Sequence, residues 1–254
     1  MSRDRTLEQL PPAVQRFLPS FGKRVGAALG QALESVHLYG SAARGEYVEG
    51  RSNLNLLVTL GEFDGPRLRT LAPLLATWKK ERLVTLVLRT TEVERWAEQF
   101  PLEFGDLLDH RVMVGGRDVL AGIRAVHTGL AAAIVREAHA NVLRVRQRYL
   151  EGGASTESAM ILMALSVTGV GVCARGLLRL WDETPSAATD AALQRVCERV
   201  GVAVEPLMEG WAVRCGRISP GQLEIPRLFD RYMDGLEQWV QRVAGALTTP
   251  GGQP

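Results

Sequence analysis

Residues 36–60, with the sequence VHLYGSAARGEYVEGRSNLNLLVTL, decide the fold of this chain. A short apolar run predicts a buried strand that ends at Gly40, and the leucine-rich run 54–60 predicts a second strand. Between them lies a polar loop, in which Gly45 and Gly50 can adopt the left-handed backbone conformation. The stretch therefore predicts two strands joined by a glycine turn and a loop.

The turn after the first strand consists of Gly40 and Ser41. A glycine lets the backbone approach a ligand closely, and successive N–H groups together with a hydroxyl form a concave site for an anion. Phosphate is the usual anion in such a site, so the turn predicts phosphate binding.

Three short patterns in this stretch resemble the nucleotidyltransferase superfamily of DNA polymerase beta and the aminoglycoside adenylyltransferases: Gly40-Ser41, Arg44-Gly45, and Ser52 followed by two polar residues that alternate with Leu54 and Leu56. The resemblance covers roughly residues 30–120. It implies that the Gly-Ser turn binds the phosphates of a nucleotide, and it makes Gly40, Ser41, Arg44 and Ser52 the candidate nucleotide-binding residues. It also implies two aspartates on the second strand that bind two magnesium ions.

The two polar positions on the second strand are Asn53 and Asn55 in this chain. Strand alternation places both side chains on one face, as the metal-binding aspartates of the family would be placed. An asparagine offers a neutral carbonyl oxygen, whereas magnesium prefers carboxylates together with substrate phosphates. The pair therefore predicts a degenerate metal site with the geometry kept and the charge lost.

The superfamily also carries a third carboxylate on a later strand, as a metal ligand or general base. The strand expected over residues 83–88 contains no acidic residue, so Glu103 and Asp106 on a following strand are the candidates. For Glu103 itself we favour a solvated or paired strand residue.

Two groups of arginines are candidates for contact with phosphate. Arg44 follows the Gly-Ser turn directly, and a guanidinium can bridge two phosphate oxygens. Arg144, Arg146 and Arg148 lie between the apolar residues of a predicted helix, so their arrangement favours a solvated helix face.

Composition excludes several functional classes. The chain of 254 residues has 46% hydrophobic and 23% charged residues, which is typical of a globular protein and excludes a mainly disordered one. A net charge of +2 gives no strong signal for nucleic-acid binding. Three dispersed cysteines and an N-terminus without an apolar signal segment lead us to expect a cytoplasmic protein with reduced thiols.

Hydrophobic periodicity predicts two domains. Helices over 12–33, 67–81 and 91–99 alternate with strands near 36–39, 54–60 and 83–89, which predicts an α/β (α+β) domain with a small mixed sheet over residues 1–120. Residues 110–120 are expected to form a turn-rich connector.

Residues 121–254 are predicted to form a bundle of four or five helices, near 123–150, 155–181, 188–200, 207–215 and 225–247. The uncharged run 158–174 is better explained as a buried bundle helix than as a membrane span. The resemblance implies that an acceptor substrate would bind in a cleft between the two domains.

The sequence is compatible with three functions. The hypothesis that we favour is a catalytically impaired relative that binds a nucleotide triphosphate through the Gly-Ser turn. The alternatives are an active enzyme, which would use Mg²⁺ and ATP to transfer a nucleotide to a small-molecule acceptor, and a non-catalytic protein that binds a protein partner. Retention of the apolar pattern alongside loss of the catalytic charge favours the non-catalytic functions, because a fold does not guarantee its usual activity.

Overall fold

The computed structural model describes residues 6–219 and 224–248, and the chain forms two compact units. The first unit spans Met1–Val126 and the second spans His127–Pro254. The division falls just after the connector that was expected to end at residue 120.

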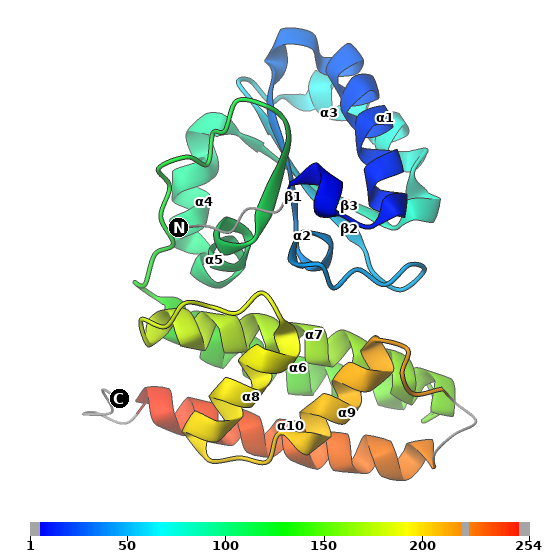
Figure 1. Ribbon diagram of the computed structural model, residues 1–254, viewed down its shortest axis with the longest axis vertical. Coiled ribbons are helices and arrows are strands. Elements are labelled where there is room, and N and C mark those ends of the chain that lie inside the picture. Colours follow the sequence, from blue (N-terminus) through cyan, green and yellow to red (C-terminus); the bar gives the residue numbers. More distant parts are fainter. Residues whose placement is uncertain (1–5, 220–223, 249–254) are drawn as a thin grey trace. The chain divides into compact units, whose positions relative to one another are not determined.

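The first unit contains a mixed four-stranded sheet in the order β3-β2-β1-β4 (Figure 1). Strands β1 (Leu33–Tyr39) and β2 (Leu54–Leu60) are antiparallel, as are β1 and β4 (Arg111–Gly116). Strand β3 (Leu83–Arg89) runs parallel to β2. The mixed sheet confirms the predicted α/β fold class.

The helices of this unit are α1 (Pro12–Leu29), α2 (Ser41–Arg44), α3 (Gly65–Ala76), α4 (Val93–Gln99) and α5 (Pro101–Asp109). Short 3-10 segments cover Leu7–Gln9 (η1), Gly30–Ala32, Lys79–Glu81 and Thr90–Glu92. Helix α1 continues through Pro19. Asp64 caps α3 by accepting a hydrogen bond from the Arg67 amide at 2.9 Å.

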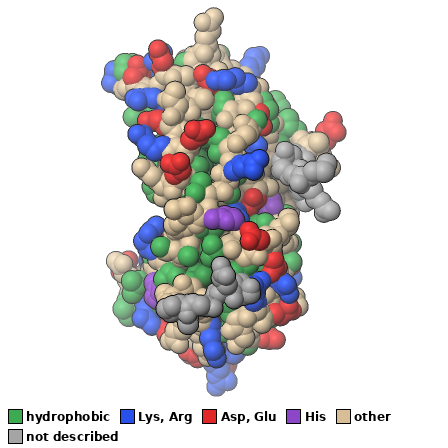
Figure 2. All heavy atoms as spheres, turned by 90° about the vertical axis from the view of Figure 1, so that its left-hand side faces the viewer, with side chains coloured by type: hydrophobic (Ala, Val, Ile, Leu, Met, Phe, Trp, Pro, Cys, Tyr) green, Lys and Arg blue, Asp and Glu red, His purple; other side chains and the backbone are tan. Residues whose placement is uncertain are grey.

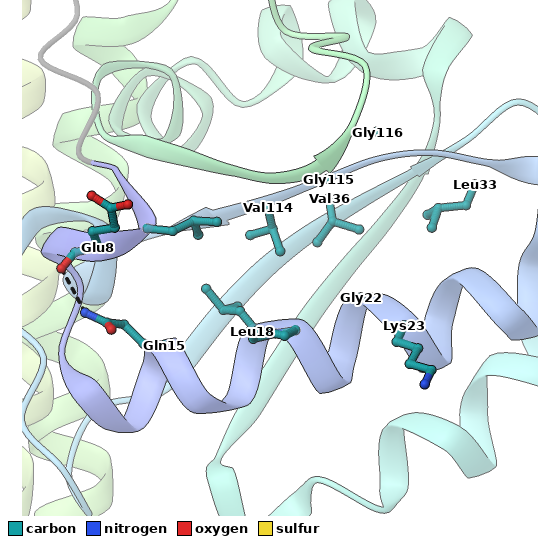
Figure 3. Close-up of a pocket in the computed structure, with 12 residues that line it drawn as sticks. Glu8, Gln15, Leu18, Gly22, Lys23, Leu33, Val36, Val114, Gly115 and Gly116 are labelled. Atoms are coloured by element: carbon teal, nitrogen blue, oxygen red, sulfur yellow. Dashed lines mark hydrogen bonds between the residues drawn. The ribbon is translucent and has the colours of Figure 1, made fainter.

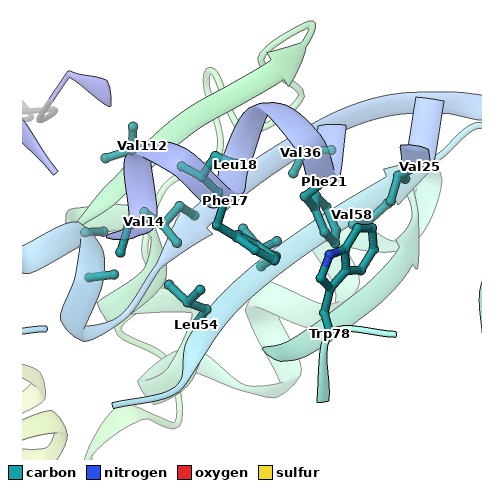
Figure 4. Packing of buried hydrophobic residues seen from close by; sticks show 14 of the residues in the cluster. Val14, Phe17, Leu18, Phe21, Val25, Val36, Leu54, Val58, Trp78 and Val112 are labelled. Carbon is teal, nitrogen blue, oxygen red and sulfur yellow. The ribbon is translucent and has the colours of Figure 1, made fainter. Parts of the chain in front are cut away.

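The two faces of the sheet carry separate apolar cores because side chains alternate along β2. Leu54 and Val58 face α1, where Phe17 and Phe21 pack with Trp78 (Figure 4). Leu57 belongs to the second core, with residues of α4 and α5. The strand that carries Asn55 is therefore covered on both faces.

Two predictions for the segment after β3 were wrong. Glu103 and Asp106 lie on helix α5 and not on a strand, and 111–116 forms strand β4 instead of a connector. Pro101 occupies the first turn of α5, where a missing N–H costs nothing because that position has no intrahelical partner.

The second unit contains five helices: α6 (Leu130–Glu151), α7 (Thr156–Leu180), α8 (Thr189–Val200), α9 (Glu205–Arg214) and α10 (Ile225–Thr248). Helix α7 packs against each of the other four (Figure 1). By length and composition alone α7 could cross a membrane, but 67% of its most apolar window is buried inside the structure. That burial is typical of the central helix of a bundle.

A chain of polar contacts crosses three helices of the bundle. The Asn141 side chain on α6 donates to the Ser166 carbonyl on α7 at 2.9 Å. The Tyr232 hydroxyl on α10 donates to the Ser166 hydroxyl at 2.8 Å. All three residues are buried, so these hydrogen bonds satisfy polar groups that would otherwise be costly to remove from water.

Surface charge is mixed on the face shown in Figure 2, where basic and acidic side chains are interspersed. This distribution agrees with the small net charge of +2. Among the described residues on the displayed face, basic side chains form no extended stripe of the kind typical of nucleic-acid-binding surfaces.

Candidate functional site

The Gly-Ser turn forms directly after β1. Gly40 has φ of 75° and ψ of −151°, a conformation that is essentially restricted to glycine. Ser41 opens the four-residue helix α2, which replaces the first part of the expected loop. Gly45 ends α2 in the left-handed conformation, and the Glu46 amide donates to the Ser41 carbonyl at 2.8 Å.

The structure brings Asn55 to this turn. Tyr39 and Asn55 are register partners on β1 and β2, so Asn55 lies beside the residue that follows Tyr39. A Cβ atom at position 40 would lie 2.5 Å from Asn55 Nδ2, which is closer than real contacts allow. The Asn55 amide therefore occupies the space that a side chain at position 40 would fill.

Ser41 and Asn55 are both available to a ligand. Within the described part of the chain, neither the Ser41 hydroxyl nor the Asn55 amide has a hydrogen-bond partner, and both side chains are partly exposed. The turn thus presents one hydroxyl and one amide next to a glycine backbone.

Asn53 is exposed and lies just before β2. Its Oδ1 accepts a hydrogen bond from Arg82 Nε at 3.2 Å. Arg82 has φ of 54° and immediately precedes β3, the parallel neighbour of β2. No local sequence pattern indicates Arg82, because only the pairing of β2 with β3 brings it to Asn53.

Arg44 is buried and holds two carboxylates. Its Nη1 lies 2.8 Å from Asp106 Oδ2, and its Nε lies 3.1 Å from Glu46 Oε2. The guanidinium therefore connects α2 to α5. Its contact with phosphate remains a prediction, and in the structure its charge is balanced by protein carboxylates.

Ser52 and Glu103 have different surroundings. The buried Ser52 hydroxyl accepts from the Val48 amide at 2.8 Å and closes the loop before β2. Glu103 is exposed on α5. Of the predicted site residues, the structure brings Gly40, Ser41 and Asn55 together and gives Ser52 a loop-closing contact.

The donor set at the turn does not fit a pair of magnesium ions. Asn53 and Asn55 contribute neutral amides, whereas magnesium sites use one or more carboxylates with the substrate phosphates. Within residues 6–219 and 224–248, no group of three or more His, Cys, Asp or Glu side chains could hold a metal ion. Burial raises the pKa of the Tyr39 hydroxyl, so Tyr39, the residue before the turn, is uncharged at physiological pH, as the two asparagines are.

Comparison with known proteins gives a structural match. No protein-family model matches the sequence, and no curated protein matches it. Among solved structures, a spectinomycin adenyltransferase AAD(9) from Enterococcus faecialis, determined with ATP and spectinomycin, matches with a TM-score of 0.50. The match covers 92% of this chain and 100% of that one, at 12% sequence identity.

The fold is nucleotidyltransferase-like. At this low identity the match establishes the fold alone, and it confirms the fold that the residue patterns around Gly40 implied. Any chemistry at the site depends on the side chains that surround the turn.

Proposed function

We propose that this protein binds a nucleotide triphosphate at the Gly40–Ser41 turn without catalysing nucleotidyl transfer. The observation that carries the proposal is the position of the Asn55 amide against Gly40. A carboxylate at that position would repel a phosphate and need a cation between them. An amide can donate hydrogen bonds to phosphate oxygens directly.

Two further features support direct phosphate binding. The Ser41 hydroxyl can donate from the same turn, and the exposed Arg82 brings a positive charge next to Asn53. Transfer of a nucleotidyl group depends on metal ions that neutralise charge as it develops on the phosphates. Neutral amides at positions 53 and 55 do not supply that metal site, so binding without turnover follows.

The test is calorimetric titration of ATP, first in EDTA and then with excess Mg²⁺. We expect binding in EDTA that is no weaker than binding with Mg²⁺. Replacing Ser41 or Asn55 with Ala should weaken ATP binding by about tenfold or more, since a hydrogen bond to a charged group contributes about 1.5–3 kcal/mol. Ser20→Ala, at an exposed serine on α1, is the matched control.

The double variant Asn53→Asp/Asn55→Asp tests the electrostatic argument. We expect it to lose ATP binding in EDTA and to recover it when Mg²⁺ is added. Failure of the wild-type protein to bind ATP, GTP, CTP or UTP would leave the partner-binding alternative. Release of pyrophosphate by the wild-type protein, abolished in Asn55→Ala, would show an active enzyme and overturn the proposal.

A further inference from the structure

A second candidate site lies on the α1 side of the sheet, in a cavity of about 530 Å³ (Figure 3). A stripe of α1 from Gln15 to Lys23 forms one wall, and residues of β1 and β4 form the other. Segment η1 contributes Leu7 and Glu8 at one end. The volume lies within the range of small-molecule sites, which are commonly about 300–1,000 Å³.

Two glycines keep this cavity open. A Cβ atom at Gly22 on α1 or at Gly115 on β4 would meet nothing within 4 Å. A glycine inside a helix destabilises it relative to alanine, and close packing is the usual reason for one. Gly210 has that reason, because its Cβ would lie 2.5 Å from the Tyr232 ring. Gly22 has no such neighbour, so its effect on the structure is the space that it leaves.

The inner surface of the cavity is apolar. Leu18, Val36 and Val114 lie between its two ends in Figure 3. The Gln15 side-chain amide is already engaged, since its Nε2 donates to the Glu8 and Leu10 carbonyls, each at 2.8 Å. The middle of the cavity therefore suits a hydrocarbon body.

Charge distinguishes the two ends. Glu8 lies at one end and Lys23 at the other (Figure 3). The Lys23 stem lines the cavity, its side chain extends away from the strands, and it forms no ion pair within the described residues. Helix α1 carries Arg16, Lys23 and Arg24 and no acidic residue. An anionic group is thus favoured at the Lys23 end and disfavoured at the Glu8 end.

We propose that this cavity binds a medium-chain carboxylate, with the alkyl chain along Leu18, Val36 and Val114 and the carboxylate at the mouth beside Lys23. The site is separate from the Gly40–Ser41 turn and does not depend on nucleotide binding. Burial of the alkyl chain would supply most of the affinity, and the ammonium group of Lys23 would set the preference for an anionic head group.

The experiment is calorimetric titration of the full chain with decanoate below its micelle concentration, with decanol as the uncharged probe. The wild-type protein should bind decanoate at least several-fold more tightly than decanol. Gly22→Leu, which fills the cavity, should weaken binding of both probes by more than tenfold. Lys23→Gln should abolish the preference for decanoate and leave decanol binding unchanged.

Matched controls separate the cavity from general surface binding. Gly245→Leu adds the same side chain at an exposed glycine of α10, and Lys80→Gln removes a lysine away from the cavity, so both should bind like wild type. If Gly22→Leu does not fold, Gly115→Val fills the cavity from β4. Three results would overturn the proposal: no decanoate binding by the wild type, unchanged binding in the cavity-filling variant, or equal affinity for decanol.

Discussion

Arg44 and Asp106 form a buried ion pair, with Arg44 Nη1 2.8 Å from Asp106 Oδ2, although 62 residues separate them in the sequence. The pair joins the short helix after the Gly-Ser turn to helix α5. It gives Arg44 a structural function in holding the candidate site, whether or not a phosphate also contacts it.

Removing one partner of this pair should destabilise the protein. Asp106→Ala leaves the Arg44 guanidinium buried with only part of its countercharge, and we expect a loss of about 3 kcal/mol in the free energy of unfolding. Glu103→Ala on the same helix is exposed and should change stability by less than about 0.5 kcal/mol. Denaturant unfolding of both variants measures the difference. A recovery in Arg44→Met/Asp106→Leu would identify the uncompensated charge as the cause.

The Gly40 conformation predicts a second stability effect. Gly40→Ala should lose about 1–3 kcal/mol, because a non-glycine residue is strained at φ of 75° and ψ of −151° and its Cβ meets the Asn55 amide. Gly40→Ala/Asn55→Ala removes the contact but keeps the backbone strain. The double variant should therefore remain less stable than Asn55→Ala alone, as thermal unfolding can determine; equal stability would contradict the backbone argument.

Thiol reactivity should differ among the three cysteines. Burial raises the pKa of Cys197 to about 12, and Cys173 is also buried, whereas Cys215 is partly exposed. Since the thiolate is the reactive form, Cys197 should resist modification by an aromatic disulfide reagent at pH 8. We expect one fast thiol per chain in the folded protein and three in denaturant. Cys215→Ser should remove the fast reaction, and Cys197→Ser should retain it.

The acid stability of the first unit should depend on Glu34. A hydrogen bond from Arg117, and a second from Thr90 at 2.9 Å, lower the pKa of Glu34 below its ordinary value of 4.5. A lowered pKa in the folded state stabilises the protein above the unfolded value, and this contribution is lost as the pH falls through the folded pKa.

Glu34→Gln should accordingly be less stable than wild type at pH 7, by up to about 1 kcal/mol because Arg117 is largely exposed. The difference should shrink as the pH falls below 4.5 and disappear once Glu34 is protonated in the folded state. Urea unfolding at a series of pH values measures it. The exposed Glu94→Gln is the control, and a constant difference across the acid range would contradict the linkage.

The fold was largely predictable from hydrophobic periodicity, since the strands β1 to β3 and the five bundle helices follow clear patterns. Helix α5 was not predicted, although Glu103, Asp106 and Asp109 recur at the three-residue spacing of a helix, because seven of its nine residues, Asp106 included, are buried. Pro101 was the available signal for its start. Strand β4 was missed because its final Gly115 and Gly116 are typical of a turn.

The candidate site was only partly predictable. The Gly-Ser pair predicted the turn, and strand alternation predicted the face on which Asn55 lies. The structure brings the turn and Asn55 together. The contacts of Arg44 with Asp106 and of Asn53 with Arg82 join segments that are distant in sequence, so no local pattern could indicate them. Hydrophobic periodicity also does not show which polar side chains are buried, and burial determines how strongly such a pair contributes to stability.

The hydrogen bonds that join Asn141, Ser166 and Tyr232 also restrict how the helices can slide. Apolar stripes alone tolerate several axial alignments of nearly equal energy, because one leucine can replace another at a contact. A shift of α6 or α10 by one turn, about 5.4 Å, would leave an amide or a phenol without its hydrogen-bond partner among hydrocarbon groups. These three side chains thus favour a single axial alignment of α6, α7 and α10.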